Sequence, residues 1–120
     1  MINKNSTKAE VLKAVKQNWR ALEFANEVLR NDREVVLTAV KEEGRALFYA
    51  SEALQNDREV VLVAVKQNER ALFYASAALR NDREVVMAAV KNSGLALKDA
   101  SEDLKFEALR YVGLSVWNRS

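Results

Sequence analysis

The chain has 120 residues, and its 19 lysines and arginines nearly balance its 17 aspartates and glutamates, leaving a formal net charge of +2. This length suits a single domain (1–120), and so small a surplus points to no particular partner. Cysteine and histidine are both absent, which excludes disulfides, thiol nucleophiles, a histidine base and metal sites built on either residue. We therefore expect no cofactor and no metal.

The first ten residues are polar where a secretion signal would be apolar. No apolar run approaches the roughly 20 residues that a membrane-spanning helix needs. Together with the lack of cysteine, this favours a cytoplasmic or otherwise intracellular protein that makes no membrane contact. Delivery into a host cell would leave no mark that the sequence could show.

A repeat of about 25 residues organises the chain, within the range typical of helical solenoids. Residues 7–30 form a degenerate first copy, in which Thr7 replaces an aspartate and Trp19 replaces a glycine. Three closer copies follow at 31–55, 56–80 and 81–104, each opening with Asn-Asp-Arg-Glu-Val-Val. Residues 105–120 remain as a C-terminal segment.

Each copy predicts two helices. The first begins at an aspartate such as Asp32, which suits an N-cap and typically contributes about 1 kcal/mol. It continues through an apolar stripe and ends near Gly44 or Gly94, where glycine can adopt the left-handed conformation. The second helix is expected from Arg45 to Gln55, with leucines and alanines on its inner face.

The C-terminal segment predicts one more helix that seals the last copy. Glu107 falls where the next aspartate would stand, and apolar residues follow at helical spacing. The residues expected to form this seal are Phe106, Leu109, Tyr111, Val112, Leu114, Val116 and Trp117. Short helices are marginal alone, so the copies must stack on one another. The predicted fold is all-α: a solenoid of about four short helical hairpins with a C-terminal capping helix.

The repeated strings also resemble a known family. Asn-Asp-Arg-Glu-Val-Val-Leu-x-Ala-Val-Lys followed by Arg-Ala-Leu-x-Tyr-Ala-Ser is similar to the repeat of the domain-of-unknown-function 4116 family. The resemblance covers residues 7–104 and is strongest over 32–51 and 57–76. It implies a helical repeat module, and it supplies no activity, substrate or catalytic residue.

Equivalent charged residues are expected to form rows along such an array. One basic row comprises Lys16, Lys41, Lys66 and Lys91, and a second comprises Arg20, Arg45 and Arg70. These rows could contact phosphates, or they could be ordinary complements of helix dipoles on solvated faces. A third set, Arg33, Arg58 and Arg83, could bridge consecutive copies through carboxylates.

Positions that vary between copies are the better candidates for binding. One such position holds Glu23, Phe48, Phe73 and Lys98 in successive copies. We hypothesise that Phe48 and Phe73 anchor a protein-binding face rimmed by Arg45, Arg70 and Glu52. The alternatives are that they fold under a neighbouring helix or pair in a homodimer. The next position, with Phe24, Tyr49 and Tyr74, is expected to pack against the core.

These patterns favour a binding protein over an enzyme, because catalysis needs a unique convergence of groups in a pocket. The predicted function is a non-catalytic protein–protein interaction module. It would be a homo-oligomer, an adaptor, or a small inhibitor or effector acting on a larger complex. The alternative is a nucleic-acid-binding repeat that uses Lys16, Lys41, Lys66, Lys91 and Arg20. Steep salt dependence would identify that alternative.

Overall fold

The computed structural model describes the backbone of residues 1–119 and the side chains of residues 1–110. Each of the first three repeats consists of a ten-residue α-helix, a six-residue 3-10 helix (η) and a single α-helical turn, and in the last repeat a long helix takes the place of that turn. The first two repeats contain α1 (Lys8–Gln17), η1 (Trp19–Phe24), α2 (Glu27–Arg30), α3 (Arg33–Glu42), η2 (Gly44–Tyr49) and α4 (Glu52–Gln55). The rest of the chain contains α5 (Arg58–Gln67), η3 (Glu69–Tyr74), α6 (Ala77–Arg80), α7 (Arg83–Asn92), η4 (Gly94–Asp99) and α8 (Glu102–Arg119).

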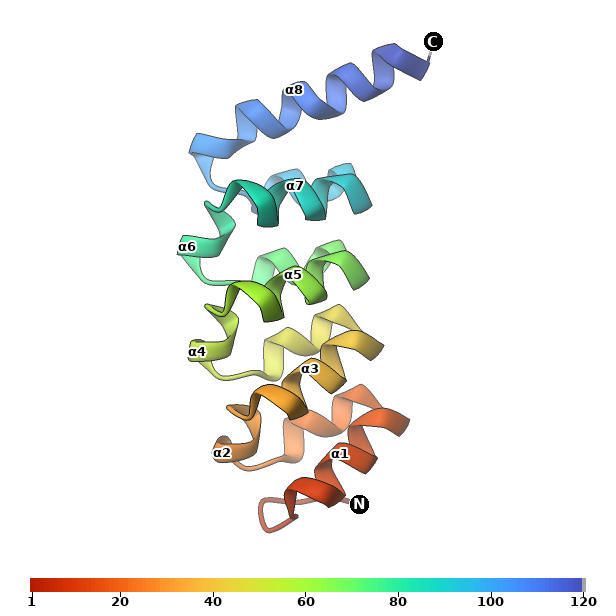
Figure 1. Cartoon of the computed structure of the whole chain (residues 1–120), viewed down its shortest axis with the longest axis vertical. Helices are drawn as coiled ribbons and strands as arrows, with labels where there is room; N and C mark the ends of the chain where they lie inside the picture. Colours follow the sequence, from red (N-terminus) through yellow and green to blue (C-terminus); the bar gives the residue numbers. More distant parts are fainter. Residues whose placement is uncertain (120) are drawn as a thin grey trace.

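The repeats stack into an elongated array of 53 × 27 × 17 Å. The helices α1, α3, α5 and α7 lie side by side in one layer, and η1 to η4 form a second layer packed against it (Figure 1). The short helices α2, α4 and α6 run along one edge, and α8 closes the C-terminal end (Figure 1). This arrangement confirms the predicted all-α repeat fold.

The core lies between the two layers and repeats from unit to unit. In α3, the inward stripe is Val35, Val36, Ala39 and Val40, all fully buried, and Leu47 of η2 closes over it. Equivalent residues of α5 with η3, and of α7 with η4, continue the same core. Because every inward stripe is covered by its neighbours, no unit can bury its apolar surface alone.

Side-chain caps start the long helices where the sequence predicts them. The carboxylates of Asp32, Asp57 and Asp82 accept hydrogen bonds from backbone amides three residues later, at 3.0 to 3.1 Å. In the first copy, Thr7 and Glu10 form a reciprocal capping box instead. The predicted N-caps are therefore confirmed, including the degenerate one.

The second helix of each repeat is not continuous, so the expected helix from Arg45 to Gln55 is wrong. The 3-10 helix η2 ends at Tyr49, Ala50 is extended, and Ser51 starts the separate turn α4. The Ser51 amide donates to the carbonyl of Arg30 in the preceding unit at 3.0 Å. Because that amide is committed across the unit boundary, it cannot join the hydrogen bonding of its own helix.

Gly44 is needed for space and not for a left-handed turn, so that expectation is also wrong. No described residue has a positive φ, and Glu43 at the end of α3 is extended with φ of −154°. A Cβ on Gly44 would overlap the carbonyl oxygen of Ala64 and lie 3.1 Å from the amide nitrogen of Asn68. Glycine allows the next unit to approach this closely.

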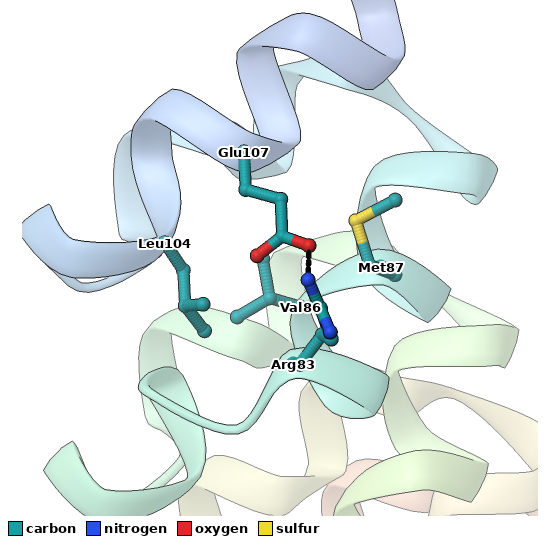
Figure 2. Close-up of a pocket in the computed structure, with 5 residues that line it drawn as sticks. All are labelled: Arg83, Val86, Met87, Leu104 and Glu107. Carbon is teal, nitrogen blue, oxygen red and sulfur yellow. Dashed lines mark hydrogen bonds and ion pairs between the residues drawn. The ribbon is translucent and has the colours of Figure 1, made fainter.

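The capping helix exists, but α8 begins at Glu102, earlier than the expected 105. Phe106 and Glu107 stand where other copies have the Asn-Asp turn, so the helix continues through that point. Figure 2 shows Glu107 reaching Arg83 between Leu104 and Met87, where α8 meets α7. Contacts of α8 with the last unit thus preserve the charge pairing of the repeat.

Two of the residues expected to form the seal, Phe106 and Leu109, do not contribute to it. Ala108 is buried and Leu104 packs against the core, whereas Phe106 is 78% exposed and Leu109 is also exposed. Without the Asn-Asp break, α8 keeps one helical phase, which turns Phe106 and Leu109 outward. The side chains of Tyr111, Val112, Leu114, Val116 and Trp117 lie outside the described residues. No helix in the described part of the chain is long and apolar enough to cross a membrane.

Candidate interaction surface

One set of repeated charges joins consecutive units. Three cations contact the N-cap aspartate of the next unit and the glutamate two residues later, as in Arg33 with Asp57 at 3.1 Å and Glu59 at 2.8 Å. Arg58 repeats this with Asp82 and Glu84, Lys8 does so with Asp32 and Glu34, and Arg83 pairs with Glu107. Together these pairs form an ion-pair ladder along the array, as expected for Arg33, Arg58 and Arg83.

The three aspartates of the ladder, Asp32, Asp57 and Asp82, have lowered pKa values. Hydrogen bonds from Arg33 and from the backbone hold the pKa of Asp57 below its usual value, and Arg58 does the same to Asp82. At Asp32, partial burial acts in the opposite direction, but the bonds from Lys8 and the Val35 amide outweigh it and lower the pKa. These carboxylates are therefore ionised helix caps with cationic partners.

A second ladder uses the repeated serines and asparagines. Ser76 donates through its hydroxyl to Asn56 Oδ1 at 2.6 Å, and its amide donates to the Gln55 carbonyl at 2.9 Å. The same hydroxyl also caps α6 by accepting from the Leu79 amide at 3.2 Å. Equivalent contacts join Ser51 to Asn31 and Ser101 to Asn81. The serine and asparagine positions that repeat along the chain are thus used to hold units together.

The variable position, in contrast, faces solvent. Phe48 is 56% exposed and Phe73 is 60% exposed, on the outward side of η2 and η3. Tyr74 lies between them, with ring centroids 5.2 Å from Phe48 and 5.4 Å from Phe73. The two phenylalanines are therefore neighbours in one surface and not separate exposed residues.

The row continues toward the N-terminus through Tyr49 and Trp19. The ring centroids of Phe48 and Tyr49 are 5.2 Å apart, and those of Tyr49 and Trp19 are 6.2 Å apart. We call the five residues Trp19, Tyr49, Phe48, Tyr74 and Phe73 the aromatic face. Their rings meet at tilted or edge-on angles, which is the favoured geometry for aromatic pairs.

Cations border the aromatic face at both ends. The guanidinium carbons of Arg20 and Arg45 lie 5.2 and 5.6 Å from the Trp19 ring centroid, within cation–π distance. At the other end, Arg70 and Lys98 line an open groove together with Phe73, Tyr74 and Asp99. Of the residues predicted to rim Phe48 and Phe73, Arg45 and Arg70 therefore border the aromatic face.

Glu52 does not belong to this surface. It is the first residue of α4, in a separate shallow groove formed with Ala53, Gln55, Asn56 and Ser76. Arg45 is also engaged locally, because its side chain pairs with the buried corner residue Glu43, whose Oε1 accepts from Asn68 at 3.1 Å. This corner network fixes the start of η2 beside the aromatic face.

Phe24 departs from the expected burial, whereas the tyrosines follow it. Tyr49 and Tyr74 are half-buried against the core, but Phe24 is 48% exposed. Trp19 occupies the Gly44 position of the first copy and packs partly against the core. Its place in the aromatic face was missed by pattern analysis, although a tryptophan at a glycine position was the available signal.

The lysine row lies on the long-helix layer. Lys16, Lys41, Lys66 and Lys91 each occupy the last turn of α1, α3, α5 or α7, and all four are exposed. Arg20 lies on η1 and is exposed beside Trp19. Lysines in the last turn of a helix also complement its dipole, so the row has a structural role without any ligand.

The described residues offer no metal site, since no cluster of three or more carboxylates is positioned to hold an ion.

The model of a family described as a domain of unknown function (DUF4116) matches three overlapping segments, residues 11–55, 32–80 and 57–105. No curated protein and no solved structure matches the chain. The matched segments each span a pair of adjacent repeats.

Proposed function

We propose that this chain, which belongs to the DUF4116 family of uncharacterised repeat domains, is a non-catalytic protein–protein interaction module that binds through its aromatic face. The observation that supports this most strongly is the pairing of Phe48 and Phe73, which are more than half exposed yet contiguous through Tyr74. Exposing two large aromatic rings is costly in water, and contiguous apolar surface on a monomer typically marks an interaction site.

The composition of the face also matches what binding surfaces use. Aromatic residues and arginine dominate the energetics of protein interfaces, and this surface combines five aromatic rings with Arg20, Arg45 and Arg70. The rings are held by η1, η2 and η3, which pack on the core. A face that is rigid before binding loses little conformational entropy when a partner docks.

A non-catalytic role is supported by how the charged groups are used. The carboxylates with lowered pKa include Asp32, Asp57 and Asp82, which cap helices and pair with cations of the preceding unit. These carboxylates stabilise the fold and do not converge on a cavity, as catalytic groups would. We therefore favour an adaptor, or a small inhibitor that occupies a surface of a larger complex.

Nucleic-acid binding is the second candidate, supported by the exposed lysine row and by Arg20 beside Trp19. It would use Lys16, Lys41, Lys66 and Lys91 for phosphates. Binding of this kind weakens steeply with salt because counterions are released. Anchoring through Phe48 and Phe73 would respond weakly to the same change.

The test is a selection of protein ligands from a displayed library of random peptides and protein fragments. Ligands selected on the wild type are measured against a Phe48→Ser, Phe73→Ser double variant and against Phe106→Ser. Phe106 is the matched control, because it is an exposed phenylalanine outside the aromatic face. We expect ligands that bind the wild type and the Phe106→Ser control but do not bind the double variant.

Two results would count against the proposal. Ligands that bind all three proteins equally would place the binding surface elsewhere. Binding of a single-stranded or double-stranded oligonucleotide that falls by orders of magnitude between low and moderate salt would favour the lysine row instead. Light scattering on the same three proteins tests whether the partner is a second copy of the chain.

A further inference from the structure

Three positions along the aromatic face each place a tyrosine, or the residue that replaces it, between two flanking side chains; we call these positions notches and the flanking side chains ridges. Notch 1 has Trp19 and Phe48 as ridges and Tyr49 between them, and notch 2 has Phe48 and Phe73 with Tyr74 between them. Notch 3 lies beyond Phe73, where Lys98 is the ridge and Asp99 takes the tyrosine position. The first two notches are aromatic and the third is polar.

We propose that this face binds an extended, proline-containing segment of a partner protein in the polyproline II conformation. A proline would occupy each of notches 1 and 2, and an acidic side chain would occupy notch 3. The ligand motif is thus two prolines and one acidic residue, each three positions apart. This inference rests on the proposed function and specifies the partner's chemistry.

The spacing of the notches carries the argument. The ring centroid of Tyr74 lies 5.2 Å from that of Phe48 and 5.4 Å from that of Phe73. The distance between the two phenylalanine rings therefore cannot exceed the sum of these two distances. Packed helices are separated by about 8–10 Å, which sets the repeat distance of the notches. A polyproline II helix has three residues per turn and rises about 3.1 Å per residue, so every third residue returns to the same side after about 9 Å. The repeat distance of the notches and the three-residue rise of a polyproline II helix therefore agree.

The chemistry of the notches agrees with that occupant as well. Proline-rich segments are recognised in grooves lined with aromatic rings, and their preformed conformation keeps the entropy cost of binding low. Tyr49 and Tyr74 are half-buried between the ridges, where a tyrosine hydroxyl can donate to the unpaired carbonyls of a polyproline II backbone. An α-helical ligand has no such free carbonyls along its length.

The charged residues around notch 3 favour an acidic residue at one end of the ligand. Notch 3 combines Arg70 and Lys98 with a single carboxylate, Asp99, which leaves it with a positive balance. Neither Arg70 nor Lys98 forms an ion pair with any described residue, whereas Arg45 at the opposite end is paired with Glu43. At notch 1, Arg20 is also outside any ion pair with a described residue. The two such cations at notch 3, against one at notch 1, favour an acidic side chain more at notch 3.

The ring geometry disfavours stacked bases as the occupant. Phe48 meets Tyr49 at 71° and Tyr74 at 60°, and Phe73 meets Tyr74 at 80°. Successive bases of a single strand need ring faces that they can stack on in parallel. Trp19 and Tyr49, at 37°, are the pair nearest to parallel. The crossing rings around notch 2 suit a compact ring such as proline better than a run of stacked bases.

The test measures fluorescence anisotropy of end-labelled synthetic peptides built around Pro-Ala-Ala-Pro-Ala-Ala-Glu. The same motif in reverse order covers the opposite chain direction. Control peptides replace both prolines by alanine, or the glutamate by lysine. The proteins are the wild type, the Phe48→Ser, Phe73→Ser double variant, the Phe106→Ser control and Lys98→Glu.

We expect one of the two chain directions to bind the wild type and Phe106→Ser equally. Loss of both prolines, or of both phenylalanines, should weaken binding by about tenfold or more. Lys98→Glu should weaken the glutamate peptide and strengthen the lysine peptide, reversing the preference between them. That reversal would assign the acidic position to notch 3, because non-specific hydrophobic binding to the aromatic rings would not depend on the charge of residue 98.

The inference fails if neither chain direction binds, or if the alanine peptide binds as well as the proline peptide. An oligonucleotide that competes with the proline peptide for the aromatic face would also overturn it. The library selection described above separates this failure from failure of the proposed function. Ligands that need Phe48 and Phe73 but lack the proline spacing would leave the interaction module intact and refute only the polyproline ligand.

Discussion

The close approach at Gly44 makes a strong prediction about stability. In Gly44→Ala, the new Cβ would overlap the Ala64 carbonyl oxygen of the next unit, so α5 or η2 must move. Movement would also disturb Gln67, whose side chain accepts from the Gly44 amide and donates to the Glu42 carbonyl at 3.1 Å. The substitution therefore acts on the contact between two units.

The magnitude follows from two opposing effects. Overpacking a tight contact costs about 1–3 kcal/mol. Replacing glycine by alanine at an ordinary backbone conformation stabilises by about 0.4–1 kcal/mol, because the unfolded chain loses freedom. Because the overlapping atom is a backbone oxygen, the upper half of the overpacking range applies. The net loss is then about 1–2.5 kcal/mol, or a fall in Tm of about 4–10 °C for a chain of this size.

Urea and thermal unfolding followed by circular dichroism measure this change. Gly94→Ala is the matched control, because Gly94 holds the same position in the last unit and is exposed. We expect the control to match or slightly exceed the wild type. If Gly44→Ala is as stable as Gly94→Ala, the close approach does not constrain the array and the reasoning is refuted.

Two further predictions concern the ladders. The folded pKa of Asp57 lies below its usual value. The stability that Asp57 contributes is therefore present above about pH 4 and is lost as the pH falls through the lowered folded pKa. Urea midpoints measured between pH 7 and 2 should show this loss, and Asp57→Asn should show a smaller one. Ser76→Ala removes a cap and a bond to Asn56 and should cost about 1–2 kcal/mol in urea, against little effect for Ala77→Ser on the exposed side of α6. An unchanged Ser76→Ala midpoint would contradict the second ladder.

The fold was largely predictable because its determinants are local and repeated. The caps at Asp32 and Thr7, the apolar stripes and the 25-residue period all lie within short stretches of sequence. The pairing of Arg83 with Glu107 was also accessible, since Glu107 keeps the register of the aspartates. Features of this kind need no knowledge of distant contacts.

The corrections arise where one unit acts on another. The break at Ser51 depends on the Arg30 carbonyl, and the need for Gly44 depends on Ala64. Neither partner is identifiable from local periodicity. The exposure of Phe106 follows from the loss of the Asn-Asp break, whose effect on helical phase shows only once α8 is continuous.

The candidate surface was predictable only in part. Charged residues at Glu23 and Lys98 indicated that Phe48 and Phe73 occupy a water-tolerant position, and the structure exposes both phenylalanines. The continuity of the aromatic face was not predictable, because Trp19 reaches Tyr49 from a different position of a different unit. Contacts between unlike positions of neighbouring units leave no periodic signal.

The central claim is that the aromatic face binds a partner and is separable from what holds the array together. The most direct measurement compares the wild type with the Phe48→Ser, Phe73→Ser double variant for both thermal unfolding and affinity for a ligand selected on the wild type. The account predicts a Tm within a few degrees of the wild type and a loss of affinity of about tenfold or more. A double variant that unfolds, or that binds the ligand as tightly as the wild type, would contradict it.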